Sequence, residues 1–193
     1  MMNYKLILGS QSPRRQQLMQ ELGFIFTTRV ISIDEDFPED LAVEQVAEYL
    51  AIEKGKAHLD SIAADELVIT ADTTVVVGQE VLNKPLSAEE ARTMLRKLSG
   101  CSHHVISGVC LTTQQWQRSF SEQTMVHFAS LTAEEISFYV EKYQPLDKAG
   151  GYAIQEWIGM IGISGIEGSY FNVVGLPVHQ LYQTLKKVIL NKG

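Results

Sequence analysis

The sequence predicts an α/β protein in which helices flank a mixed β-sheet, folded as a single compact domain over residues 1–193. Three observations predict this class. Short apolar runs alternate along the chain with segments whose apolar residues recur at helical spacing. The helical segments begin at recognisable caps and end at glycine or proline. Neither an internal repeat nor a flexible linker interrupts the sequence, and this length suffices for one buried core.

Composition and charge exclude several classes of protein. Hydrophobic residues make up 45% and charged residues 20%, which is typical of soluble globular proteins. The net charge of −7 argues against broad binding to nucleic acid or to an anionic membrane, so any phosphate is expected to be bound locally. Two cysteines are too few for a disulfide scaffold. Because the sequence has no leader-like start and no apolar run of membrane length, we expect a cytoplasmic protein.

The first segment reads as a buried strand that leads into a helix. Tyr4–Leu8 is a short apolar run, and Ser12 and Pro13 suit the N-cap and the first helical position. Helical spacing of apolar residues follows until Gly23, which ends the pattern. Free N–H groups at such a helix start favour an anion, although the Gly-Lys-Ser/Thr of a Walker A loop is missing.

Arg14 and Arg15 stand in the first turn of this helix, where both oppose the helix dipole. A bound polyphosphate would compensate for that cost, because guanidinium groups bind phosphate in a bidentate way. The alternative is a capped surface helix whose two arginines are simply hydrated.

A second strand is expected over Phe24–Ile33, followed by an acidic loop over residues 34–40. Most such loops are only hydrated, but one carboxylate near a phosphate site can reach a metal ion. A long amphipathic helix is expected from Ala42 to about Leu59. Lys54 lies in its apolar stripe, so this side chain either extends outward to water or meets an anion, and we favour the anion.

The strongest strand pattern of the chain is Leu67–Val77, and Asp72 stands in its middle. A buried carboxylate there requires a cation, a metal ion or several hydrogen-bond donors. The alternative is an aspartate bonded to the backbone at a β-bulge. Val81–Leu82 is expected to return as a strand, and Lys84 follows at the strand end, as a candidate site residue or an ordinary surface lysine.

The middle of the chain predicts two capped helices and two strands. The patterns Ser87-x-x-Glu90 and Thr132-x-x-Glu135 are capping boxes. Between the two helices, strands are expected over Val105–Leu111 and Phe120–Phe128, joined by a turn at Gln114-Gln115. The cluster Cys101, His103 and His104 invites a zinc site, but no second ligand cluster accompanies it, so we do not predict one.

The last part of the chain is rich in glycine. In Asp147–Gln155, Gly150 and Gly151 would permit close approach of the backbone to a ligand. Further glycines recur at 159, 162, 165 and 168, which we interpret as turns and bulges. Tyr170–Val174 is expected to be a strand, and a final helix is expected to begin after Gly175-Leu176-Pro177.

Four motifs together resemble those of the Maf family of nucleoside triphosphate pyrophosphatases. They are Gly-Ser-x-Ser-Pro-Arg-Arg from Gly9, Ala-Asp-Thr-x-Val from Ala71, Asn-Lys-Pro from Asn83 and Asp-Lys-Ala-Gly-Gly-Tyr-Ala-Ile-Gln from Asp147. The resemblance implies an elongated mixed sheet around a central cleft, similar to inosine triphosphatase. It also implies hydrolysis of a nucleoside triphosphate to the monophosphate and pyrophosphate with divalent Mg²⁺ or Mn²⁺, and it allows a homodimer.

The resemblance also implies roles for individual residues. Asp72 matches the proton acceptor, and Arg14, Thr73 and Gln155 match the positions linked to base choice, with identities similar to the dTTP and UTP branch. Asp72 and Glu35 are the candidate metal ligands, since Mg²⁺ and Mn²⁺ prefer oxygen. The other matched positions of the implied cleft are Ser10, Arg15, Glu35, Lys54, Lys84, Asp147 and Lys148.

This chain departs from the family pattern at two places. The usual Ala-Gly-Ala-Tyr-Gly-Ile-Gln is replaced by Ala-Gly-Gly-Tyr-Ala-Ile-Gln, followed by Glu156, and the segment Trp157–Ile166 is unusually apolar. Two alternatives remain at this point. A nucleotidyltransferase would turn over only with a sugar phosphate, and a non-catalytic regulator of cell division would bind nucleotide without hydrolysing it.

Overall fold

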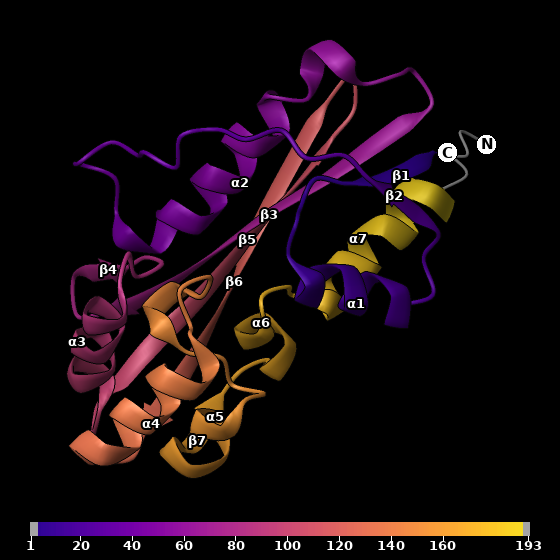
Figure 1. Cartoon of the computed structure of the whole chain (residues 1–193). Coiled ribbons are helices and arrows are strands. Elements are labelled where there is room, and N and C mark those ends of the chain that lie inside the picture. Colours follow the sequence, from indigo (N-terminus) through magenta and orange to yellow (C-terminus); the bar gives the residue numbers. More distant parts are fainter. Residues whose placement is uncertain (1–3, 191–193) are drawn as a thin grey trace. The chain divides into compact units, whose positions relative to one another are not determined.

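The computed structural model describes residues 4–190, whose helices and strands are labelled in Figure 1, and the chain divides into two compact units. The first unit contains the chain up to Asp72, the segment Ser107–Glu122 and the chain from Gly175 onward. The second contains Thr73–Ile106 and Gln123–Val174. No helix within residues 4–190 has both the length and the apolar character that crossing a membrane requires.

The strands form a mixed seven-stranded sheet with the order β2-β1-β3-β5-β6-β7, and β4 pairs with β3. The pair β1–β3 is parallel, whereas β3–β4 and β6–β7 are antiparallel. The bounds are β1 Lys5–Leu8, β2 Phe26–Thr28, β3 Glu66–Val77, β4 Glu80–Leu82, β5 Ser102–Thr112, β6 Gln117–Phe128 and β7 Ile163–Glu167. The predicted α/β class with a mixed sheet is therefore confirmed.

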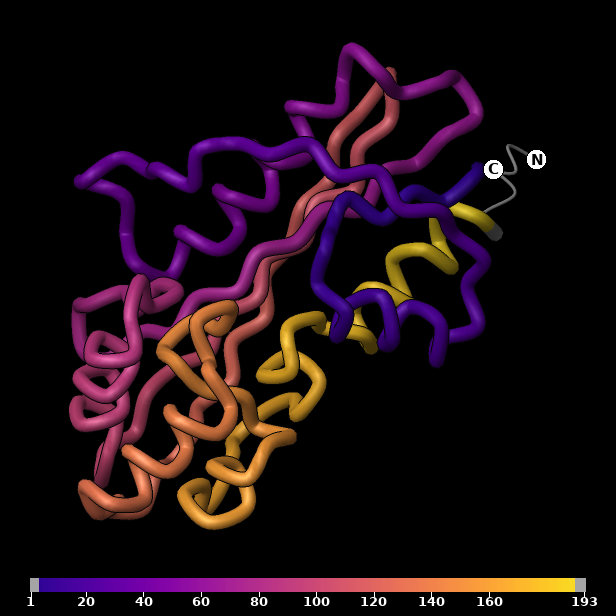
Figure 2. The backbone as a smooth tube through the Cα atoms, viewed as in Figure 1, coloured from indigo at the N-terminus to yellow at the C-terminus, as the bar shows by residue number. Residues whose placement is uncertain are grey.

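The helices divide between the two units. The first unit contains α1 Pro13–Glu21, α2 Val46–Lys56 and α7 Val178–Leu190. The second contains α3 Ala88–Leu98, α4 Ala133–Tyr143, α5 Trp157–Gly162 and α6 Tyr170–Val174. A short turn joins β5 to β6, as the tube in Figure 2 shows, and in it the N–H of Thr113 donates to the carbonyl of Trp116 at 2.9 Å.

Two helix N-caps are confirmed in full, and of the third predicted capping box only the Ser87 contact is present. The Ser12 side chain accepts from the N–H of Arg15, and Thr132 with Glu135 forms the complete capping box. Ser87 accepts from the N–H of Glu90, but the Glu90 carboxylate accepts from Leu86 at 2.8 Å rather than from the cap residue itself. The sequence pattern alone does not determine which nearby N–H the glutamate reaches.

Two predicted elements of the first unit are shorter than expected. The strand predicted over Phe24–Ile33 is only Phe26–Thr28, because β1, the strand with which it pairs, is itself four residues long. The helix predicted over residues 42–59 is α-helical only over Val46–Lys56, with single 3₁₀ turns at Val43–Gln45 and Leu59–Ser61. At its end, the N–H of His58 bonds three residues back to Gly55, which tightens the last turn.

Two predictions for the end of the second unit are wrong. Tyr170–Val174 is the helix α6 rather than a strand, because Ser169 accepts from the N–H groups of Asn172 and Val173 and so starts a helical turn. Trp157–Gly162 is the helix α5 rather than a series of turns. The strand that pairs with β6 lies between these helices, at Ile163–Glu167.

The helix α2 packs so closely on β5 that Gly108 has no room for a side chain. A Cβ atom at Gly108 would lie 2.3 Å from the carbonyl oxygen of Ala47, which is helix backbone and cannot rotate away. We expect Gly108→Ala to lower the free energy of unfolding by about 1–3 kcal/mol through overpacking. Denaturant titration measures this change.

Gly165→Ala is the matched control, because a Cβ atom there would meet only the His127 ring at an ordinary 3.6 Å. Equal losses of stability in the two variants would contradict the proposed close packing of α2 on β5.

Candidate functional site

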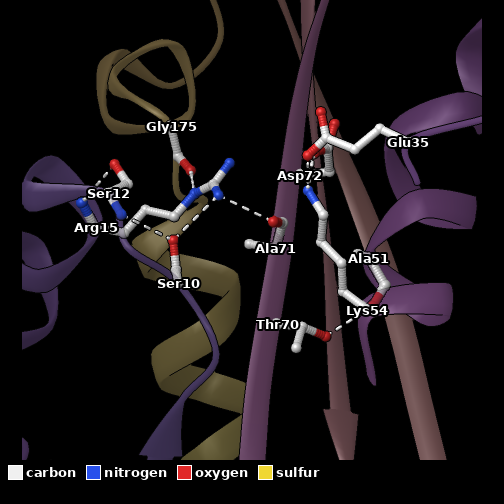
Figure 3. A network of polar contacts seen from close by, with 10 residues as sticks. All are labelled: Ser10, Ser12, Arg15, Glu35, Ala51, Lys54, Thr70, Ala71, Asp72 and Gly175. Carbon is white, nitrogen blue, oxygen red and sulfur yellow. Dashed lines mark hydrogen bonds and ion pairs between the residues drawn. The ribbon is translucent and has the colours of Figure 1, made fainter. Parts of the chain in front are cut away.

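Alternate residues of β3 contact the helix α2 in the first unit (Figure 3). The hydroxyl of Thr70 donates to the carbonyl of Ala51 at 2.7 Å, and two residues later Asp72 accepts from the ammonium of Lys54 at 2.5 Å. This spacing follows from the pleat of a strand, in which residues two apart share a face. The strand therefore aims the Asp72 carboxylate at α2.

Lys54 is held between two carboxylates. Its Nζ lies 2.5 Å from Oδ1 of Asp72 and 2.6 Å from Oε1 of Glu35, which comes from the acidic loop. The side chains of Asp72 and Lys54 are only 8% and 15% exposed, whereas that of Glu35 is 43% exposed. The prediction that Lys54 meets an anion in the interior is confirmed, and the buried Asp72 has the cation that it was expected to need.

Arg15 donates to the main chain at two distant points (Figure 3). Its Nε donates to the carbonyl of Gly175 at 2.8 Å, and its Nη1 donates to the carbonyl of Ala71 at 2.9 Å and to the hydroxyl of Ser10 at 3.4 Å. Burial lowers the pKa of the Arg15 guanidinium, and the nearby Asp72 carboxylate raises it in part. Because Ala71 immediately precedes Asp72, Arg15 fixes the backbone that carries the carboxylate.

The loop before α1 is ordered by its own hydroxyl groups. Ser12 donates its N–H to the hydroxyl of Ser10 at 3.2 Å, and its own hydroxyl accepts from the N–H of Arg15 at 3.4 Å. Ser10 is buried, and Arg14 is half-buried in the first helical turn. The strand, loop and capped helix predicted for this motif are confirmed, whereas a role in phosphate binding stays a prediction.

The second unit contains a separate charged group around Lys148. The Lys148 side chain is 8% exposed, and its Nζ lies 2.7 Å from Oδ1 of Asp147 and 3.4 Å from Oε1 of Glu156. The other carboxylate oxygen of Glu156 accepts from the hydroxyl of Tyr139 at 2.5 Å. Burial, followed by this contact with Glu156, raises the pKa of Tyr139, so the phenol remains a donor.

The remaining predicted residues lie at the following places. Thr73 is half-buried directly after Asp72 in β3, Lys84 is exposed after β4, and Gln155 is exposed before α5. Gly150 and Gly151 have φ values of 67° and 70°. Cβ atoms there would meet Val75 at 3.0 Å and Ala91 at 3.4 Å. Both glycines therefore lie close to the protein's own atoms, and a close approach to a ligand stays a prediction.

The structure joins the predicted residues in small groups within each unit. Glu35, Lys54 and Asp72 form one group, Ser10 and Arg15 a second, and Asp147 and Lys148 a third. The sequence reasoning missed the carbonyls of Ala71 and Gly175, for which side-chain identity gives no signal. It also missed the hydrogen bond between Tyr139 and Glu156.

Within the cluster of Cys101, His103 and His104, Cys101 is exposed and His103 is buried. The His103 ring is buried, its Nε2 lies 2.7 Å from the hydroxyl of Tyr152, and burial lowers its pKa to about 4. Across residues 4–190, no three side chains of His, Cys, Asp or Glu gather as a metal-ligand group.

Comparison with known proteins found a matching family, similar proteins and a similar solved structure. Residues 5–188 match the family described as Maf-like protein. The dTTP/UTP pyrophosphatases of Phocaeicola vulgatus and Bacteroides thetaiotaomicron are 52% and 50% identical to the chain over 186 residues, covering 96% of each protein. That of Christiangramia forsetii is 46% identical and covers 97% of this chain and 95% of its own. A HAM1 protein structure from Coxiella burnetii covers 95% of this chain and 99% of its own, with a TM-score of 0.51 at 15% identity, and so shows the shared fold.

Proposed function

The chain belongs to the Maf family, and on that premise we propose that it hydrolyses dTTP and UTP to the nucleoside monophosphate and pyrophosphate. Relatives that carry the name dTTP/UTP pyrophosphatase and share about half of its residues support this activity. The observation that carries the proposal is the buried Asp72 carboxylate, which shares the ammonium of Lys54 with Glu35. Burying a carboxylate and an ammonium costs desolvation free energy even when the two charges pair. A buried charged pair is therefore a candidate for a functional role.

In the proposed reaction, the oxygen of a water molecule bonds to the α-phosphorus, and the bond from that phosphorus to the bridging oxygen breaks. The water gives its proton to a carboxylate oxygen of Asp72, and pyrophosphate leaves. Arg15 keeps Asp72 in place through the carbonyl of Ala71, so the proton acceptor is positioned before substrate binds. Arg14 and Lys54 supply positive charge for the phosphate oxygens.

The residues around Lys54 fit a divalent metal ion. The carboxylates of Asp72 and Glu35 converge on one positively charged point, the Lys54 Nζ, at 2.5 and 2.6 Å. Mg²⁺ and Mn²⁺ take oxygen ligands of this kind. When bound, such an ion neutralises phosphate charge and polarises water.

We assign base recognition to the loop that ends at Gln155. Its side-chain amide offers both a donor and an acceptor, which suits the edge of a pyrimidine. Arg14 and Thr73 are the other positions that the family resemblance links to base choice. The remaining proposed substrate-binding residues are Lys84, Asp147 and Lys148.

We also propose a cytoplasmic location and a homodimer for this protein, without a role for nucleic acid or membrane.

A nucleotide panel tests the activity. The purified protein is incubated with dTTP, UTP, CTP, ATP and GTP, and pyrophosphate and orthophosphate are measured separately. We expect pyrophosphate release from dTTP and UTP. Chelation with EDTA should lower this release to background, and addition of Mg²⁺ or Mn²⁺ should restore it. Absence of pyrophosphate from both pyrimidine substrates would overturn the proposal.

The same panel separates the two alternatives. Turnover that requires an added sugar phosphate would indicate a nucleotidyltransferase. Tight binding of nucleotide in calorimetry without any release would indicate a regulator.

A further inference from the structure

Glu156 joins two buried groups of the second unit through its two carboxylate oxygens. Oε2 accepts from the hydroxyl of Tyr139 at 2.5 Å, and Oε1 lies 3.4 Å from the ammonium of Lys148. The ring of Tyr139 is fully buried and the Lys148 side chain is 8% exposed, while Glu156 itself is 22% exposed. A carboxylate in this position ties helix α4 to the start and the end of the loop over residues 148–156.

The short run from Ala153 to Glu156 is fixed from several sides. The N–H of Ala153 donates to the hydroxyl of Tyr139 at 3.2 Å, and the N–H of Glu156 donates back to the carbonyl of Ala153 at 3.1 Å. A Cβ atom at Gly159 would lie 1.8 Å from the carbonyl oxygen of Ile154, so α5 packs directly against this run. The backbone on both sides of Gln155 is therefore held in one conformation.

Gln155 is the exposed member of this otherwise buried run. Residues 151–154 are buried and Glu156 is half-buried, whereas Gln155 is exposed. Because Gln155 is exposed, the backbone fixes the Cα–Cβ direction from which its side chain extends. A contact that holds this backbone thus limits the positions that the amide group can reach.

Lys148 depends on Glu156 for its charge balance. Its other carboxylate partner, Asp147, is 60% exposed and lies 2.7 Å away, so that contact is partly screened by water. Removal of the Glu156 charge would leave the buried ammonium with the hydrated Asp147 as its carboxylate partner among residues 4–190. The expected response is a movement of the Lys148 side chain.

We propose that Glu156 is a positioning residue for base selection, which orients Gln155 through Tyr139 and holds the ammonium of Lys148 in place. This inference rests on the proposed function, because it assigns a cause to the selectivity of that activity. Glu156 itself touches neither substrate nor reacting atoms in this assignment.

The test is the selectivity ratio, defined as kcat/KM for UTP divided by kcat/KM for ATP. A variant that merely folds less well loses activity toward both substrates equally, so the ratio stays constant. We expect Tyr139→Phe and Glu156→Ala to lower the ratio about tenfold. Each variant loses the hydrogen bond that orients the loop, and a tenfold change corresponds to about 1.4 kcal/mol of binding free energy. Glu156→Gln keeps an acceptor for Tyr139, and we expect a smaller change of about two- to threefold.

Two substitutions on helix α4 serve as controls. Tyr143→Phe removes a hydroxyl from the same helix, and Glu141→Gln removes an exposed carboxylate that pairs with Arg92 at 3.4 Å. Both should keep the wild-type ratio. If Glu156→Ala fails to fold, Tyr139→Phe and Glu156→Gln carry the test, because each retains most of the packing.

The possible results separate this inference from the activity itself. A wild-type protein that hydrolyses no nucleotide overturns the proposed function, and the ratio is then measured by calorimetry as binding of non-hydrolysable UTP and ATP analogues. An unchanged ratio in folded Tyr139→Phe and Glu156→Gln overturns the positioning role. A wild-type protein that prefers neither nucleotide overturns it too.

Discussion

Replacement of Asp72 by asparagine is expected to lower kcat for UTP about a hundredfold to ten-thousandfold, the usual contribution of a positioned general base. Asparagine has nearly the same shape as aspartate but cannot accept the proton of the attacking water. Lys54 keeps its contact with Glu35 at 2.6 Å in this variant, so the cation remains paired. Pyrophosphate release under saturating UTP measures the effect, and thermal melting verifies that the variant is folded.

Asp65→Asn is the matched control for this experiment. Asp65 immediately precedes β3 and pairs with Lys5 at 2.8 Å, but both side chains are more than half exposed. The same chemical change should therefore leave kcat unaltered. Retention of more than about one tenth of the activity in folded Asp72→Asn would exclude Asp72 as the general base.

Replacement of Lys54 by methionine is expected to reduce both activity and stability. Methionine fills a similar volume but leaves the Asp72 carboxylate, which is 8% exposed, without the ammonium. Breaking a buried ion pair in this way typically costs about 3–5 kcal/mol of unfolding free energy. Denaturant unfolding gives the stability, and we expect the hydrolysis of UTP to fall at least about a hundredfold through the loss of a cationic group.

A double-mutant cycle and a control substitution on the same helix test whether the stability loss comes from the pair of Lys54 and Asp72. Lys54→Met combined with Asp72→Asn should lose less stability than the two single losses added together, since the buried charge of Asp72 is removed together with its partner, while Glu35 is 43% exposed to water. Lys56→Met lies on the same helix and breaks an exposed pair with Glu53, so we expect a loss below about 1 kcal/mol. Additive losses in the cycle would show that Lys54 and Asp72 do not interact.

Local chemistry made much of the fold predictable. The caps at Ser12 and Thr132, the central strand and the final helix each follow from signals within a few residues, and the structure contains them. Tyr170–Val174 misled the prediction because its aromatic and β-branched residues favour a strand, while Ser169 starts a helix. That outcome depends on a hydroxyl outside the segment, which composition within the segment does not reveal.

The sequence indicated which charged residues of the candidate site need ionic partners, but it did not indicate which residues pair with each other. A charge inside an apolar strand and a lysine inside an apolar helix stripe each point to an ionic partner, and Asp72 and Lys54 are partners of each other. The role of Arg15 was not accessible, because its acceptors are the carbonyls of Ala71 and Gly175. Every residue has a carbonyl, so only the folded backbone identifies which ones an arginine reaches.

The hydrogen bond from Thr70 to the helix α2 has a consequence for the evolution of this protein. Side chains of a strand point to opposite sides in turn, so a shift by a single position would send the acidic group away from its lysine. The hydrogen bond of Thr70 and the parallel pairing with β1 together fix the register of β3. Gain or loss of one codon between Thr70 and Asp72 would therefore turn the acidic side chain away from Lys54 even if every essential side chain were still encoded.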